Sequence, residues 1–208
     1  MHDSLHTNCR PKPWNKGKLI GQKLPLKQRE IWRIRANLEC ERNVRELAMF
    51  DLAIDSKLRA CDLMALRVRD VMRGDQITGR TVVLQHKTQR PVRFEITDLA
   101  RQALDTWIKH THLQADDFLF PSRCRKAAHL STRQYARIVG RWVTSIQLDR
   151  SAYGTHTMRR TKATLIYRRT GNLRAVQLLL GHTKIESTVR YLGVEVDDAL
   201  ALAEQTEV

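Results

Sequence analysis

The sequence predicts a mainly α-helical domain with a small antiparallel β-sheet, an α+β fold. Apolar residues recur at helical spacing along most of the chain, whereas one short region combines β-forming residues with a polar turn. The chain has 208 residues, of which 42% are hydrophobic and 28% charged, a composition typical of a folded globular protein. We therefore expect one domain with short appendages.

The predicted helices lie on both sides of the predicted hairpin. Upstream they span residues 27–38, 44–52 (after Asn43) and 59–66. The hairpin pairs residues 81–85 with 91–96 across the turn 86–90. Further helices are expected at 99–108, 131–146, 156–169 and 173–180, with Gly171 and Gly181 as helix terminators.

The two ends of the chain differ in charge. Residues 1–26 are polar and basic and are interrupted by proline and glycine, so they predict a flexible arm. This arm is either a plain disordered terminus or a tail that follows DNA through Lys16, Lys18 and Lys23. Residues 196–208 predict an acidic helix with one apolar face, which needs a surface in its own domain or in a neighbouring protomer.

The net charge of the chain points to a polyanionic partner. Lysine and arginine total 37 against 22 acidic residues, a net charge of +15, and double-stranded DNA is the partner that we expect. A membrane is not expected, because the sequence has no long apolar run, no apolar signal peptide and no lipidation signal. The four cysteines are scattered, which favours reduced cytoplasmic thiols over a zinc or disulfide framework.

Several motifs carry residues suited to phosphodiester chemistry. Such cleavage needs a hydroxyl that attacks phosphorus, cations for the phosphate oxygens and an acid for the leaving oxygen. Arginine suits the second role because its planar fork binds phosphate with two hydrogen bonds. His156 and Arg159 share one helix face, Arg59 lies far upstream, and the hairpin turn carries Lys87.

The order of these motifs resembles the catalytic half of the tyrosine recombinases, the phage integrase family. The resemblance runs from Arg59 through Lys87 on a β-turn, His156-x-x-Arg159 and Leu180-Gly181-His182 to Arg190-Tyr191. Each fragment alone is weak, but together they are in the right order at suitable intervals. The resemblance implies that residues 27–195 form a tyrosine recombinase catalytic domain.

The resemblance also implies a role for each motif residue. Tyr191 would attack the scissile phosphate to give a 3′-phosphotyrosine and a free 5′-hydroxyl, without ATP, metal or other cofactor. Arg59 and Arg159 would hold the phosphate oxygens, and Lys87 would protonate the leaving oxygen. Two histidines would complete the set, with His156 assisting proton transfer at the tyrosine and His182 donating a hydrogen bond to the phosphate.

The implied function is site-specific recombination: integration, excision or inversion of a mobile element by a tetrameric assembly on DNA in the bacterial nucleoid. Most family members have a separate helical domain before the catalytic half, and we expect this protein to lack it, because only about 40 residues precede the resemblance. We therefore expect weaker independent DNA binding, helped by the basic arm, by cooperative assembly or by an accessory DNA-bending protein. Lys57 stands where a glycine is common and Arg160-Thr161-Lys162 where a second histidine is often found, and both departures should add positive charge near the phosphate.

Other interpretations of the same residues exist. Each motif residue alone has an ordinary structural explanation, such as an Arg59 ion pair with Asp62 or a solvated Lys87. A DNA-binding regulator that has lost catalysis is the main alternative function, and nicking with resealing is another. A metal site at His156 and His182 is disfavoured, because no carboxylate or thiolate lies at ligand spacing.

Overall fold

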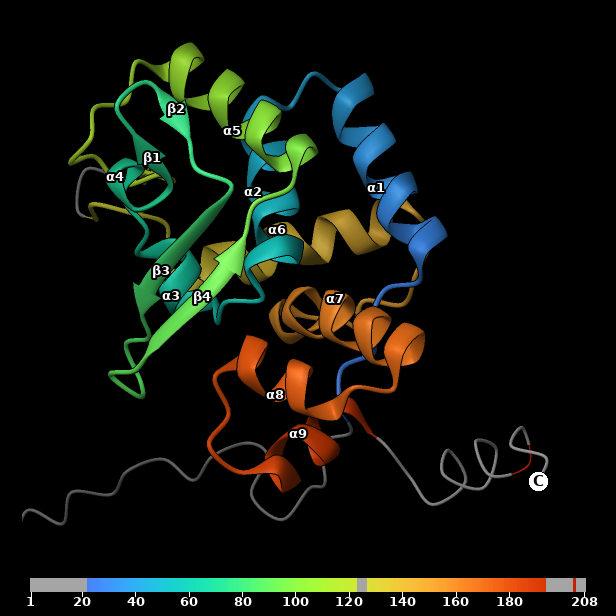
Figure 1. Ribbon diagram of the computed structural model, residues 1–208. Helices are drawn as coiled ribbons and strands as arrows, with labels where there is room; N and C mark the ends of the chain where they lie inside the picture. The colour runs from blue at the N-terminus through green and yellow to red at the C-terminus, as the bar shows by residue number, and fades with distance from the viewer. Residues whose placement is uncertain (1–21, 123–126, 194–203, 205–208) are drawn as a thin grey trace, which may run out of the picture.

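The computed structural model describes residues 22–122, 127–193 and 204. Most of the predicted N-terminal arm and almost all of the predicted acidic C-terminal helix lie outside the described residues. The described part is mainly helical, with two small antiparallel sheets (Figure 1). Its helices are α1 (Gln28–Cys40), α2 (Val44–Ser56), α3 (Ala60–Met64), α4 (Val68–Val71), α5 (Asp98–Thr111), α6 (Thr132–Ser145), α7 (Thr155–Thr170), α8 (Leu173–Leu180) and α9 (Ile185–Leu192).

The predicted hairpin is confirmed. Strand β3 (Arg80–Leu84) pairs antiparallel with β4 (Pro91–Glu95), with Val83 opposite Val92. A second sheet, formed by β1 (Met72–Arg73) and β2 (Gln76–Ile77), was not predicted. Its strands have two residues each, too few for a two-residue periodicity to be recognised.

The predicted helices are also found, and the helices that the prediction missed are short. Helix α4 has four residues and α9 has eight. In α9 the residues Ile185, Thr188 and Val189 are β-branched, which lowers intrinsic helix propensity. This helix, which carries Tyr191, is therefore stabilised by its packing against the rest of the domain and not by intrinsic helix propensity.

The larger hydrophobic core surrounds α2. Residues 48–56 of α2 are all buried, and this helix contacts α1, α5 and α7. Aromatic side chains from α6 close this core, with Phe50 edge-on to Trp142 at a centroid distance of 5.3 Å. Such burial on every side makes α2 a rigid support for the segment that follows it.

A smaller core holds the last three helices together. It consists of Ala163, Val176, Leu180 and Leu192, and the ring of Tyr191 packs against it. Helix α7 belongs to both cores, because Met158 in its first half lies in the larger one. In Figure 1, α7 crosses the middle of the molecule and α8 and α9 lie beneath it. Helix α7 therefore fixes α9 relative to the rest of the domain.

The glycine that ends α8 permits close packing on the hairpin. Gly181 has a φ of +65°, and a Cβ atom there would lie 2.6 Å from Cγ2 of Val92. Gly171, which ends α7, has a φ of +62° but open space around it. Both glycines supply the left-handed conformation, but only Gly181 also lets β4 approach.

We therefore predict that Gly181→Ala destabilises the protein more than Gly171→Ala. The left-handed strain should cost about 1 kcal/mol in each variant, and the clash with Val92 should add about 1–3 kcal/mol in Gly181→Ala. Urea unfolding of the two variants measures the difference. Equal losses would contradict the close packing of α8 on β4.

Candidate active site

Arg159 on α7 is the most buried of the predicted site residues. Its side chain is 2% exposed, and Nη2 donates a hydrogen bond of 2.6 Å to the carbonyl of Leu180. Nη1 donates to the carbonyl of Lys57. The guanidinium carbon lies 5.9 Å from the ring centroid of Tyr191. Arg159 therefore joins the end of α2 to the end of α8 and faces the tyrosine.

The charge of Arg159 has no ion pair within the described part of the chain. Burial lowers the pKa of its guanidinium, and Arg59 lowers it further. An uncompensated buried cation is unfavourable, so such a group is retained where an anion is to be bound. The site is thus suited to a phosphate.

Tyr191 presents its hydroxyl inside this cationic region. The hydroxyl oxygen is buried, and the guanidinium of Arg159 lies beside it. The guanidinium carbon of Arg160 lies 5.6 Å from the centroid of the Tyr191 ring, so that two arginines, Arg159 and Arg160, contact this ring. Burial raises the pKa of the phenol to about 12, although Arg159, Arg160 and Arg59 oppose the shift. The free protein therefore holds Tyr191 as a neutral phenol at neutral pH.

His182 lies edge-on to this tyrosine. The two ring centroids are 5.4 Å apart at an interplanar angle of 83°, and Nδ1 is 3.2 Å from the hydroxyl of the buried Thr188. Burial lowers the pKa of the imidazole to about 4, and Arg159 and Arg59 act in the same direction. His182 is therefore neutral at neutral pH, with one ring nitrogen held by the helix that carries Tyr191.

His156 lies in the first turn of α7 at the mouth of the same site. It lines a pocket of about 320 Å³ together with Tyr191 and Arg160. The residue is exposed, but partial burial of its ring lowers the pKa of the imidazole, and the charges of Arg159, Arg59 and Arg160 lower it further. A neutral imidazole can accept a proton, which is the role that the sequence predicted beside Tyr191.

Arg59 reaches the site from the start of α3. Its Nη1 donates a hydrogen bond of 2.5 Å to Oε1 of Gln85, which follows strand β3. It also lies 4.0 Å from the carboxylate of Asp62, the ordinary ion pair that the sequence allowed. Because its charge acts on His156, His182 and Tyr191, Arg59 belongs to the same site.

Lys87 is the predicted residue that the structure does not bring into contact with the other five. It is exposed in the turn between β3 and β4, and no hydrogen bond or ion pair of its side chain occurs with the described residues. Two residues before it, Gln85 contacts Arg59, so the turn is attached to the site through its base.

The predicted effect of Lys57 on the site was wrong. Lys57 adopts the left-handed conformation, with a φ of 54°, which explains why a glycine is common there. Its ammonium is fully buried, 2.9 Å from the carboxylate of Glu95, and Lys162 pairs with Asp55 and Glu95. These lysines are neutralised inside the domain and add no free charge at the phosphate.

Arg160 fits the expectation of added charge, and the sequence did not assign it a site role. It is 7% exposed, contacts the ring of Tyr191, and donates a hydrogen bond of 2.6 Å to the carbonyl of Lys23. Its position next to Arg159 on α7 was the available signal. Helical spacing alone directs adjacent residues to different faces, so it gave no reason to place both at one ring.

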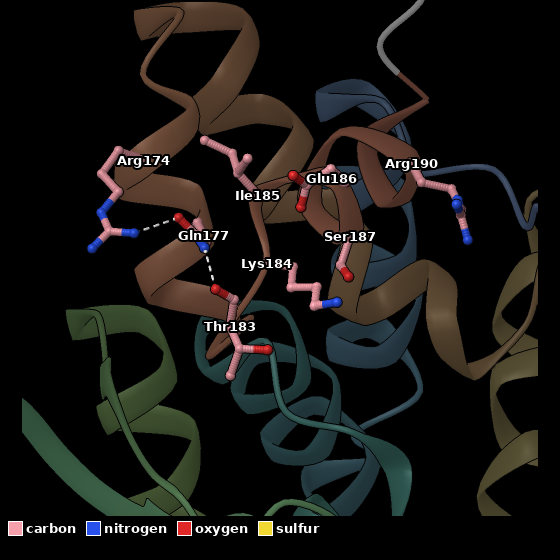
Figure 2. A pocket seen from close by; sticks show the side chains of 8 residues that line it. All are labelled: Arg174, Gln177, Thr183, Lys184, Ile185, Glu186, Ser187 and Arg190. Atoms are coloured by element: carbon pink, nitrogen blue, oxygen red, sulfur yellow. Dashed lines mark hydrogen bonds between the residues drawn. The ribbon is translucent and has the colours of Figure 1, made fainter.

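A second, open groove of about 810 Å³ lies along α8 and α9. Figure 2 shows Gln177 between Arg174 and Thr183, accepting a hydrogen bond from Arg174 and donating one to the carbonyl of Thr183. Lys184 and Arg190 also line the groove, and Glu186 contributes the one carboxylate of its described lining. The groove is thus mainly cationic and adjoins the helix of Tyr191.

The described residues hold neither a metal-binding cluster nor a membrane-spanning helix. No group of three or more histidine, cysteine, aspartate or glutamate side chains there is arranged to hold a metal ion. No helix in the described part has the length and apolar character needed to cross a membrane.

The fold and the site together define a helical domain with a buried tyrosine hydroxyl surrounded by arginines and neutral histidines. Residues 25–197 match the phage integrase family. This match covers well over half of the sequence, so the chain belongs to the phage integrase family.

Curated relatives agree with this assignment. The chain is similar to the probable integrase/recombinase YoeC of Bacillus subtilis, with 29% identity over 77% of this chain and 83% of that protein. It is also similar to tyrosine recombinase XerC of Erythrobacter litoralis, with 30% identity over 78% of this chain and 50% of that protein. The chain spans about half the length of most of the curated relatives reported for it, including the XerC proteins.

Solved structures show the same fold. The XerA recombinase aligns with a TM-score of 0.72 at 19% identity, over 89% of this chain and 65% of that one. The XerH recombinase bound to its difH substrate aligns with a TM-score of 0.68 at 20% identity, over 88% of this chain and 55% of that one. The predicted tyrosine recombinase catalytic-domain fold is therefore confirmed.

We predict that His182 titrates near pH 4 in the folded protein. NMR of the imidazole Cε1–H signal, assigned with His182→Gln, measures this midpoint. Because the folded pKa lies below the unfolded value of about 6.5, the neutral ring stabilises the fold above pH 6.5. That contribution is lost as the pH falls from 6.5 to 4. A midpoint near 6.5 would contradict the burial of His182 beside Arg159.

Proposed function

We propose that the protein is a site-specific DNA recombinase that breaks and rejoins duplex DNA through a covalent bond to Tyr191. The observation that carries the proposal is the buried Tyr191 hydroxyl, which lies beside the guanidinium of Arg159. Membership of the phage integrase family and the relatives named as recombinases support it.

In the proposed reaction Tyr191 Oη forms a bond to phosphorus while the bond from phosphorus to O5′ breaks. Arg159 and Arg59 hold the non-bridging oxygens, and their charges favour the phenolate as its proton leaves. The proton passes to the neutral His156, and Lys87 donates a proton to O5′. His182 donates a hydrogen bond to the phosphate, because its other ring nitrogen is held by Thr188.

The reaction is reversible by the same groups. A 5′-hydroxyl from another strand attacks the 3′-phosphotyrosine and returns its proton to Lys87. The bond from phosphorus to Tyr191 Oη breaks, and the protonated His156 returns a proton to that oxygen, which releases the phenol. The number of phosphodiester bonds is unchanged, so the exchange needs no external energy source. Integration, excision and inversion differ only in which strands are joined.

The DNA duplex is proposed to lie across the pocket of His156 and Tyr191. The cationic groove lined by Arg174, Lys184 and Arg190 would bind the backbone beside it. The XerH structure is a complex with a difH DNA substrate, which supports a duplex on this fold. The basic residues 1–26 would add further phosphate contacts.

We further propose that strand exchange takes place in a tetramer on DNA in the bacterial nucleoid. The acidic residues 196–208 would pack on a neighbouring catalytic domain, and an accessory DNA-bending protein would assist assembly. The acidic residues 196–208 and the basic remainder of the chain carry opposite charges. This favours contact of the acidic residues with a neighbouring protomer over their contact with DNA.

The first test is a covalent adduct with DNA. A suicide duplex, nicked so that the cleaved end diffuses away, should trap a protein–DNA adduct that survives denaturation. Tyr191→Phe should abolish the adduct while DNA affinity, measured by band shift, stays within about threefold of wild type, because one hydroxyl contributes little to phosphate binding. A band shift without any adduct in the wild-type protein would instead favour the non-catalytic regulator.

A further inference from the structure

Gln85 lies between the two parts of the site that the sequence could not connect. It is fully buried at the end of β3. Its Oε1 accepts a hydrogen bond from Nη1 of Arg59 at 2.5 Å and another from the hydroxyl of Thr88 at 2.9 Å. Thr88 is the residue after Lys87, so one amide oxygen joins Arg59 to the turn that carries Lys87.

The orientation of this amide follows from its partners. An arginine can only donate, so the atom facing Arg59 must be the oxygen. The nitrogen of Gln85 is then buried beside Gly181, 3.5 Å from the point where a Cβ atom on that residue would lie, and has no hydrogen-bond partner among the described residues. A buried amide donor without a partner is unfavourable for stability. Stability alone therefore does not explain a glutamine at this position.

A second contact fixes the same turn. The backbone N–H of His86 donates a hydrogen bond of 2.8 Å to Oδ1 of Asp62, and Asp62 also lies near Arg59. The turn is thus attached to α3 at two points. His86 binds Asp62 of α3, and Thr88 binds Gln85, which in turn binds Arg59 at the start of α3. Of Asp62 and Gln85, only Gln85 binds the Arg59 side chain and the turn with the same atom, Oε1; Asp62 uses one oxygen for His86 and the other for Arg59.

We propose that Gln85 is a positioning residue that couples the orientation of Arg59 to that of the Lys87 turn. The inference rests on the proposed function and deepens it. Arg59 holds the phosphate oxygens and Lys87 protonates O5′, so both must be in place when the bond to O5′ breaks. Through Gln85, a phosphate that orders Arg59 also orders the turn that delivers the proton.

Two variants separate the halves of this coupling. Gln85→Met keeps the side-chain volume and removes both hydrogen bonds. Thr88→Val keeps the shape and removes only the bond to the turn, while Thr88→Ser, which keeps the hydroxyl, is its matched control. Lys87→Ala is the reference for loss of the proton donor.

The first readout needs no DNA. Gln85→Met should leave the midpoint of thermal unfolding unchanged or raise it, because it removes a buried donor without a partner. The turn should nevertheless loosen, so that trypsin cleaves after Lys87 faster than in wild type, as mapped by mass spectrometry; Arg90 precedes Pro91 and is not a trypsin site. Unchanged cleavage after Lys87 would overturn the coupling whether or not the protein is a recombinase.

The second readout is the rate of single-turnover cleavage of the suicide DNA. Displaced catalytic groups cost up to about 100-fold in rate, so Gln85→Met should slow cleavage by about 100-fold and Thr88→Val by about 10-fold. Thr88→Ser should cleave as wild type does. DNA affinity should stay within about threefold of wild type in all three variants, since a displaced Arg59 weakens only one of the phosphate contacts along the duplex.

A sulfur-substituted DNA then identifies which group is displaced. In a 5′-bridging phosphorothiolate the leaving group is a thiol with a pKa of about 8.5, which departs without an acid. This DNA should restore Lys87→Ala and Thr88→Val to the wild-type rate, and Gln85→Met only in part, because Arg59 remains displaced. Equal slowing of Gln85→Met and Thr88→Val on both DNAs, or no slowing of either variant on normal DNA, would overturn the proposal. A wild-type protein that cleaves neither DNA would overturn the proposed function, and the protease result would then decide the coupling by itself.

Discussion

The hydrogen bonds of the Arg159 guanidinium hold the parts of the site together. One bond reaches the carbonyl of Lys57 at the end of α2, and the other reaches the carbonyl of Leu180 at the end of α8. The first segment leads directly to Arg59 and the second to His182. Because the guanidinium is buried without an ion pair in the described part of the chain, it also supplies the charge that a phosphate would neutralise. The same side chain therefore builds the site and prepares it for an anion.

Burial in this region acts in opposite directions on the two kinds of titrating group. It raises the pKa of Tyr191 to about 12 and lowers that of His182 to about 4, so both groups are neutral at neutral pH. The arginines oppose burial at the tyrosine and reinforce it at the histidine. Neutral histidines beside a neutral phenol are the protonation states that transfer of the tyrosine proton requires. The small core of α7, α8 and α9 imposes this burial, which is why Tyr191 depends on packing that its own short helix cannot provide.

The sequence predicted the parts of the fold and of the site that depend on local pattern. Helical periodicity located α1, α2 and α5–α8, and the motif order identified Tyr191 and the four residues that the structure gathers around it: Arg59, His156, Arg159 and His182. It missed α9, whose β-branched residues disfavour a helix until Leu192 is buried by α7 and α8. It also misjudged Lys57, because pairing with Glu95 depends on a strand far away in the sequence. Gln85 gave no signal, since its function depends on what surrounds a buried amide and not on a motif.

The measurement that tests the central claim most directly is identification of the residue and the DNA end that form the covalent bond. The adduct is digested with nuclease and protease, and the modified peptide is sequenced by mass spectrometry. The account predicts a nucleotide attached through its 3′-phosphate to Tyr191, with a free 5′-hydroxyl on the released strand. A nucleotide on Tyr153, on Tyr167 or on a serine, or attachment through a 5′-phosphate, would contradict it.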